Sequence, residues 1–188
     1  MKTSALVMLV VAVAAAAGGY FLAMRLSPVP QTRAPSLPVA MPRQEELVGQ
    51  PRPDFSLTDL QGRLVSAGEF DGKVLLLNFW ATWCAPCVEE MPMLSELQRD
   101  NADRGLQVLG IAVDDEGKAR DFARDLGVAY PVLVGQGQGM VVGRRYGNGS
   151  GMLPYSVLVG RTGIVRWVHL GALDREELER RIGALLQD

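Results

Sequence analysis

The chain has 188 residues, of which 48% are hydrophobic and 21% are charged, and its formal net charge is -2. This length fits one ordinary domain plus an additional segment and argues against two large domains. Because nucleic-acid binding depends on a surplus of Lys and Arg that neutralises phosphates, the slightly negative charge speaks against a nucleic-acid partner. The two cysteines are too few for a four-cysteine structural zinc site or a disulfide-stapled miniprotein.

The first apolar segment is 5–24, which contains no charged residue. A helix of about 20 apolar residues is long enough to cross a bilayer. The segment fits either an uncleaved signal anchor or a signal peptide that is cut after the alanine run at 15–17. Since apolar residues continue through 20–24, beyond that cleavage site, we predict that 1–25 form a transmembrane signal anchor. Both alternatives export the remainder of the chain.

The next segment, 26–53, holds seven of the eleven prolines and shows no sustained hydrophobic periodicity. This composition predicts an extended, semi-rigid linker. We therefore expect the folded domain at 54–188. That region carries 14 Lys and Arg against 19 Asp and Glu, a balance that again disfavours nucleic acid and anionic membrane surfaces as partners.

Residues 54–188 alternate between strand and helix patterns. Apolar residues on consecutive positions predict strands buried on both faces, and apolar residues three or four positions apart predict helices. Seven glycines between 135 and 151 predict a loop, without the spacing of a phosphate-binding motif. The expected elements are a hairpin (55–57 and 63–66), a strand (74–80), a helix interrupted by Pro92 (87–101), a strand (106–113), a helix (119–126), a strand (131–134), a second hairpin (156–160 and 164–170) and a helix (174–186). This order predicts an α/β fold with a mixed central sheet flanked by helices.

The residues that carry chemistry are Cys84 and Cys87, which lie between the strand at 74–80 and the helix that follows. A cysteine at a helix N-terminus lies at the positive end of the helix dipole, which lowers the thiol pKa from about 8.5 towards 7 or below. We therefore expect Cys84 to be the nucleophile and Cys87 to resolve the mixed disulfide that forms on it. Pro86 suits the first turn of a helix, where no N–H is needed.

A pair of cysteines at this spacing can also be half of a metal site or chemically inert. The strand before it, the helix after it and the absence of a second pair favour redox chemistry. Trp83 is expected to border the reactive cysteine and to help bind partners, whereas Trp80 is expected in the core. His169, the only histidine, has no acidic or nucleophilic neighbour in the sequence and is expected to be structural.

The sequence NFWATWCAPC at 78–87, followed by EEMP at 89–92, resembles the active-site segment of the thioredoxin superfamily, and in detail that of the membrane-anchored TlpA/ResA/CcmG-type disulfide reductases. The resemblance covers nearly all of 54–188 in element order, and the anchor and linker also match this group. It implies a thioredoxin-like fold on the periplasmic or extracytoplasmic face of a bacterial cytoplasmic membrane, anchored by one pass through residues 5–24. It further implies a membrane thiol reductant as electron donor and exported proteins with oxidised cysteines as substrates, as in cytochrome c maturation. No cofactor is implied.

Two further positions follow from this resemblance. A thioredoxin-like site needs a cis proline that faces the cysteines, and Pro154 lies at the matching place before the strand at 156–160. A cis peptide there leaves the backbone of Leu153 free to pair with an extended substrate segment. Thioredoxin has a buried aspartate six residues before its first cysteine, but this chain has Asn78, which does not titrate.

Glu90 corresponds by its offset from Cys87 to a glutamate that ResA-like proteins use near the site. A partly buried carboxylate there would have a raised pKa and could accept the proton from Cys87. Glu89 is expected to be the exposed residue of the two.

Two alternatives stay open. The same fold could serve a disulfide-forming oxidant, because reduction potentials range from about −270 mV in thioredoxin to about −120 mV in a strong oxidant. A second alternative is a copper-binding or copper-delivery module that uses Cys84, Cys87 and the thioether of Met91 or Met93, since thiolates and thioethers are soft ligands. Core packing is the commoner role of helical methionines, so no metal is expected.

Overall fold

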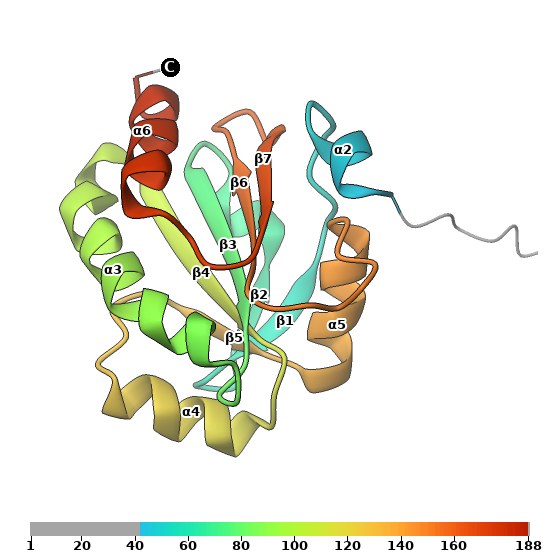
Figure 1. Cartoon of the computed structure of the whole chain (residues 1–188), viewed down its shortest axis with the longest axis vertical. Coiled ribbons are helices and arrows are strands. Elements are labelled where there is room, and N and C mark those ends of the chain that lie inside the picture. Colours follow the sequence, from blue (N-terminus) through green and yellow to red (C-terminus); the bar gives the residue numbers. More distant parts are fainter. Residues whose placement is uncertain (1–41, 188) are drawn as a thin grey trace, which may run out of the picture. The chain divides into compact units, whose positions relative to one another are not determined.

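The computed structural model describes residues 42–187 (Figure 1). The predicted membrane anchor at 1–25 and most of the predicted linker lie outside these residues. Within 42–187, no helix is both long and apolar enough to span a membrane.

A seven-stranded mixed sheet forms the centre of the domain, with the strand order β2-β1-β5-β4-β3-β6-β7. β3, β4 and β5 are parallel, and the remaining neighbours pair antiparallel on both sides of them. The strands are β1 (Ser56–Asp59), β2 (Leu64–Ser66), β3 (Val74–Trp80), β4 (Leu106–Ala112), β5 (Val132–Val134), β6 (Tyr155–Val159) and β7 (Val165–Leu170). The predicted α/β architecture with a mixed sheet is confirmed.

Helices cover both faces of this sheet (Figure 1). α3, α4 and α6 contribute core side chains on one face, and α2 and α5 contribute them on the other. The helices are α2 (Gln44–Leu47), α3 (Ala85–Asn101), α4 (Glu116–Asp125), α5 (Gln136–Arg145) and α6 (Arg175–Leu185), with short 3-10 turns η1 (Ala67–Phe70) and η2 (Ala102–Arg104). α3 continues through Pro92 rather than ending there.

β3 lies at the centre of the sheet, and all seven of its residues are buried. Its side chains alternate between the two faces, as a strand requires. Leu75, Leu77 and Phe79 belong to the cluster beneath α5, whereas Leu76 and Trp80 belong to the cluster beneath α3. The run of apolar residues that predicted a doubly buried strand therefore corresponds to a strand covered on both faces.

The segment 135–151 was predicted as a loop, and this prediction was wrong because it contains α5. Val142 is buried in the core, and Gly139 lets the helix approach the sheet closely. A Cβ atom on Gly139 would lie 3.4 Å from the carbonyl oxygen of Ala112. Burial of the apolar helix face thus outweighs the low helix propensity of glycine.

Residues 44–53, which lie within the predicted linker, contact the domain. Leu47 of α2 is buried in the core, and the N–H of Gly49 donates to the carbonyl of Val165 at 2.8 Å. The Tyr146 hydroxyl donates to the carbonyl of Pro53 at 2.6 Å. The packed part of the described chain therefore includes α2.

The close packing of α5 predicts opposite effects for two of its glycines. Gly139→Leu should lower the free energy of unfolding by about 1–3 kcal/mol, because the larger side chain must displace packed neighbours. Gly137→Ala should raise it by about 0.5–1 kcal/mol, since Gly137 is exposed and a Cβ there meets nothing within 4 Å. Urea unfolding of both variants checks this, and equal stabilities would contradict it.

Candidate active site

The two cysteines lie at the junction of β3 and α3. Cys84 is the N-cap residue of α3, and its carbonyl accepts the N–H of Val88 at 3.2 Å. The N–H of Cys84 donates to the carbonyl of Ala81 at 3.1 Å, which closes the preceding turn. Pro86 lies in the first helical turn, where its missing N–H leaves no helical bond unmade. The sequence signal for a helix start at the cysteines is confirmed.

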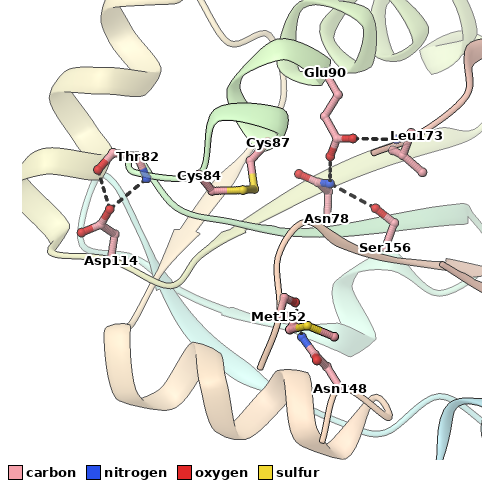
Figure 2. Close-up of a disulfide and its surroundings, with 10 residues drawn as sticks. All are labelled: Asn78, Thr82, Cys84, Cys87, Glu90, Asp114, Asn148, Met152, Ser156 and Leu173. Atoms are coloured by element: carbon pink, nitrogen blue, oxygen red, sulfur yellow. Dashed lines mark hydrogen bonds between the residues drawn. A yellow bond between two sulfur atoms is a disulfide. The ribbon is translucent and has the colours of Figure 1, made fainter. Parts of the chain in front are cut away.

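Cys84 and Cys87 form a disulfide, with their Cα atoms 5.3 Å apart (Figure 2). Cys84 is 6% exposed and Cys87 is 0% exposed, so only Cys84 retains surface that a partner can reach. The neighbouring Trp83 is 71% exposed, whereas Trp80 is fully buried. This difference places an aromatic ring beside the accessible cysteine and agrees with the predicted environments of both tryptophans.

The turn before Cys84 is held by Asp114, which follows β4. Its carboxylate accepts hydrogen bonds from the Thr82 N–H at 2.9 Å, the Thr82 hydroxyl at 2.6 Å and the Asp115 N–H at 2.7 Å. Burial favours the neutral acid, but these hydrogen bonds together lower the pKa of the Asp114 carboxyl. Sequence reasoning missed Asp114. The available signal was the strand register. Trp80 pairs with Ala112, and Thr82 and Asp114 each lie two residues beyond these partners.

Glu90 is a buried carboxylate on α3, one turn beyond Cys87. Its Oε1 accepts from Nδ2 of Asn78 at 2.7 Å, and its Oε2 accepts from the N–H of Leu173 at 3.0 Å (Figure 2). Burial raises the pKa of Glu90 to about 7, against the opposing effect of these two hydrogen bonds. The predicted burial and raised pKa are confirmed, and Glu89 is exposed as expected.

The Leu153–Pro154 peptide is cis, as predicted. Tyr155, the next residue, pairs with Phe79 near the carboxyl end of β3. Pro154 is thereby held at the same end of the sheet as the cysteine pair. Within residues 42–187, neither the N–H nor the carbonyl of Leu153 has a hydrogen-bond partner. An extended peptide could therefore pair with the backbone at this position.

The remaining candidate residues, Met91, Met93 and His169, make packing and hydrogen-bond contacts. Met91 is fully buried in the same apolar cluster as both cysteines, and Met93 packs partly buried against it. This supports core packing over copper ligation for the two methionines. The ring of His169 stacks on Trp167 with centroids 5.0 Å apart, and its Nε2 lies 3.0 Å from the carbonyl oxygen of Ala172. These contacts support the structural role expected for His169.

Comparison with known proteins agrees with this geometry. The family model described as AhpC/TSA family matches residues 48–168. The thiol-disulfide oxidoreductase ResA of Bacillus thuringiensis (strain Al Hakam) is 33% identical over 138 residues, which cover 73% of this chain and 78% of that protein. The thioredoxin-like protein YneN of Bacillus subtilis (strain 168) is 35% identical over 138 residues, covering 71% and 78%.

Among solved structures, one similar protein comes from Chlorobium tepidum and was assigned provisionally as the thiol:disulfide interchange protein DsbE. It superposes with a TM-score of 0.69 at 32% identity, covering 74% of this chain and 97% of that protein. The fold and the cysteine pair thus define a thioredoxin-like thiol:disulfide oxidoreductase. The chain belongs to the AhpC/TSA family.

The raised pKa of Glu90 predicts that stability falls as the pH rises. Between the ordinary value of 4.5 and about 7, the unfolded chain has lost the Glu90 proton while the folded protein retains it. The free energy of unfolding of the oxidised protein should therefore decrease through this window, by up to about 3 kcal/mol, and this contribution should level off above it. Urea unfolding between pH 4 and about 8 measures the slope.

Glu90→Gln should remove this part of the slope, because the amide stays neutral throughout. Glu89→Gln, which changes an exposed residue of the same helix, is the matched control and should keep the wild-type slope. The prediction fails if Glu90→Gln follows the same pH dependence as the wild type.

Proposed function

We propose that this chain is an exported, membrane-tethered oxidoreductase that reduces disulfides in extracytoplasmic proteins. The observation that carries the proposal is the unequal burial of the Cys84–Cys87 disulfide at the N-terminus of α3, at the same end of the sheet as Pro154. One cysteine is accessible to a partner and the other is enclosed next to Glu90. This arrangement suits the sequential attack of two thiols on one substrate disulfide.

In the first step, the Cys84 thiolate attacks one sulfur of the substrate disulfide. The substrate S–S bond breaks, a mixed disulfide forms at Cys84, and the other substrate sulfur leaves with the electron pair as a thiolate. The position of Cys84 as N-cap of α3 stabilises its thiolate through the helix dipole and the free N–H groups of the first turn.

In the second step, Cys87 gives its proton to Glu90 and attacks the Cys84 sulfur. The bond between Cys84 and the substrate breaks, the Cys84–Cys87 disulfide forms, and the second substrate sulfur leaves as a thiolate. The substrate is then reduced and the enzyme oxidised. A pKa near 7 suits Glu90 to this role, because a carboxylate with that value is part ionised at neutral pH and binds a proton readily.

Substrate recognition is assigned to Trp83, Pro86, Leu153 and Pro154. Trp83 and Pro86 are exposed on either side of Cys84. The unpaired backbone of Leu153 would hold an extended substrate segment as an added strand, a mode that tolerates many sequences. Such tolerance suits an enzyme whose substrates share a disulfide rather than a sequence motif.

The proposed location depends on residues 1–53. The apolar segment 5–24 would anchor the chain in the bacterial cytoplasmic membrane, the part of the linker before α2 would space it, and the domain, with α2 packed on it, would face the extracytoplasmic side. A membrane thiol reductant would return Cys84 and Cys87 to the reduced state. The similarity to ResA and to the DsbE-assigned protein supports a role in keeping exported cysteines reduced, with cytochrome c maturation as one such pathway.

Separate cysteine variants test the two steps. Cys84→Ser should abolish the reduction of insulin disulfides by the dithiothreitol-coupled protein, because no nucleophile reaches the substrate. Cys87→Ser should react once and remain joined to the substrate, since nothing resolves the mixed disulfide. Non-reducing gel electrophoresis detects that adduct.

Met91→Leu, measured in a metal-free sample, is the control and should keep full activity if the methionine only packs in the core. Insulin reduction by Cys84→Ser at the wild-type rate would refute the assignment of the nucleophile. Loss of Cu(I) binding when Met91 or Met93 is replaced would support the metal-binding alternative instead.

A further inference from the structure

Asn78 and Ser156 form a polar pair on the apolar sheet face that α3 covers. They are direct partners in the register of β3 and β6, and both are 0% exposed. On β3 the residues two positions away, Leu76 and Trp80, belong to the same apolar cluster as Cys87. Because alternate residues of a strand face one side, Asn78 faces the helix that carries the cysteines.

The side-chain amide of Asn78 is only partly satisfied. Its Nδ2 donates to Oε1 of Glu90 at 2.7 Å and to Oγ of Ser156 at 3.1 Å, which uses both of its hydrogens. Its Oδ1 is buried and has no hydrogen-bond partner within residues 42–187. An unpaired buried acceptor is unfavourable, so its retention calls for an explanation.

The unpaired oxygen lies on the side of Asn78 that is turned toward the disulfide, whereas Nδ2 is turned toward Glu90 (Figure 2). Cys87 and Glu90 are three residues apart on α3 and so share one face of the helix. A disulfide sulfur has no hydrogen to donate. The reduced Cys87 thiol has one, so reduction adds a hydrogen-bond donor on the side of Asn78 where its unpaired oxygen lies (Figure 2).

We propose that Asn78 is a positioning residue that couples proton loss at Cys87 to proton gain at Glu90. The proposal rests on the proposed function and concerns its second step. In the reduced protein, Oδ1 of Asn78 accepts the thiol hydrogen of Cys87 while Nδ2 donates to the Glu90 carboxylate. This arrangement fixes the thiol hydrogen and keeps Glu90 ionised and ready to receive a proton.

After the proton has passed from Cys87 to Glu90, the side-chain amide of Asn78 rotates so that its oxygen and nitrogen exchange places. The S–H bond of Cys87 breaks with its electron pair left on sulfur, and an O–H bond forms at Oε1 of Glu90. Asn78 then donates from Nδ2 to the Cys87 thiolate and accepts the Glu90 carboxyl hydrogen at Oδ1. The Ser156 hydroxyl both donates and accepts, so it can bond the amide in either orientation. The thiolate is thereby stabilised until it attacks the Cys84 sulfur.

The other groups that face Glu90 do not compete with it for the proton of Cys87. The backbone N–H of Leu173 is a donor only. Burial, and secondarily the charge of Glu90, raise the pKa of Tyr130 above its ordinary value, so this phenol stays protonated at neutral pH. Asn78 and Ser156 do not titrate in this range.

The test follows the two steps separately with the chromogenic disulfide DTNB and the reduced full-length protein. The first release of thionitrobenzoate reports attack by Cys84, and the second reports attack by Cys87 on the mixed disulfide. Asn78→Leu should leave the first rate unchanged, slow the second about tenfold at neutral pH, and move the pH midpoint of the second rate upward, because the Cys87 thiolate loses a hydrogen-bond donor. In a Glu90→Gln background the same substitution should have little further effect, because its partner is gone.

Gln98→Leu is the matched control, since Gln98 is another buried amide on α3 but bonds to the backbone of Leu106 and Val108. It should lower stability and leave both rates unchanged. The proposal is overturned if Asn78→Leu behaves like Gln98→Leu, or if it slows the second release by the same factor with and without Glu90. Loss of the first release in the wild type would instead refute the proposed function.

A second measurement avoids substitutions that could impair folding. In the reduced wild-type protein, carbon-13 NMR of the Glu90 carboxyl and the Cys87 Cβ should show two titration steps that both signals share, as coupled groups do. One independent step for each residue would contradict the coupling.

Discussion

The junction between β3 and α3 is the constraint on which the site depends. β3 is buried on both faces, so its carboxyl end has a fixed position, and α3 begins only a few residues later. The turn between them is further held by the carboxylate of Asp114, which binds both the N–H and the hydroxyl of Thr82. Cys84 is therefore delivered to a helix N-terminus, where the backbone itself favours the thiolate.

The same docking of α3 encloses Cys87 and Glu90 against the sheet. A carboxylate in this position is costly to ionise, which is why the pKa of Glu90 is raised. Within residues 42–187 it accepts hydrogen bonds from two donors, Asn78 and Leu173. The Glu90 carboxyl is therefore partly protonated and partly ionised at neutral pH. The accessible cysteine and the enclosed cysteine thus have different surroundings that match their different tasks.

Much of the fold and of the site could be predicted, because the sequence patterns that indicate them are local. Consecutive apolar residues identify β3 and β4, and the spacing of Cys84 and Cys87 after a buried strand identifies the helix start. The cis peptide at Pro154 and the burial of Glu90 followed from resemblance to a known family, and the structure agrees with both. These features depend on short stretches of sequence and on their order.

The features that sequence reasoning missed depend on contacts between distant residues. α5 forms in a glycine-rich segment because Gly139 packs closely on the sheet, which composition alone does not reveal. Asp114 reaches Thr82 across 32 positions through the parallel register of two strands. Ser156 meets Asn78 across 78 positions, again through strand pairing. Periodicity within one element contains no information about such partners.

The measurement that tests the central claim most directly is the equilibrium reduction potential of the Cys84–Cys87 pair. It is obtained by titrating the metal-free protein in dithiothreitol and glutathione buffers. A reductant of exported disulfides should have a value near or below about −250 mV. A value near −120 mV would contradict the proposed direction of electron flow and identify a disulfide-forming oxidant instead.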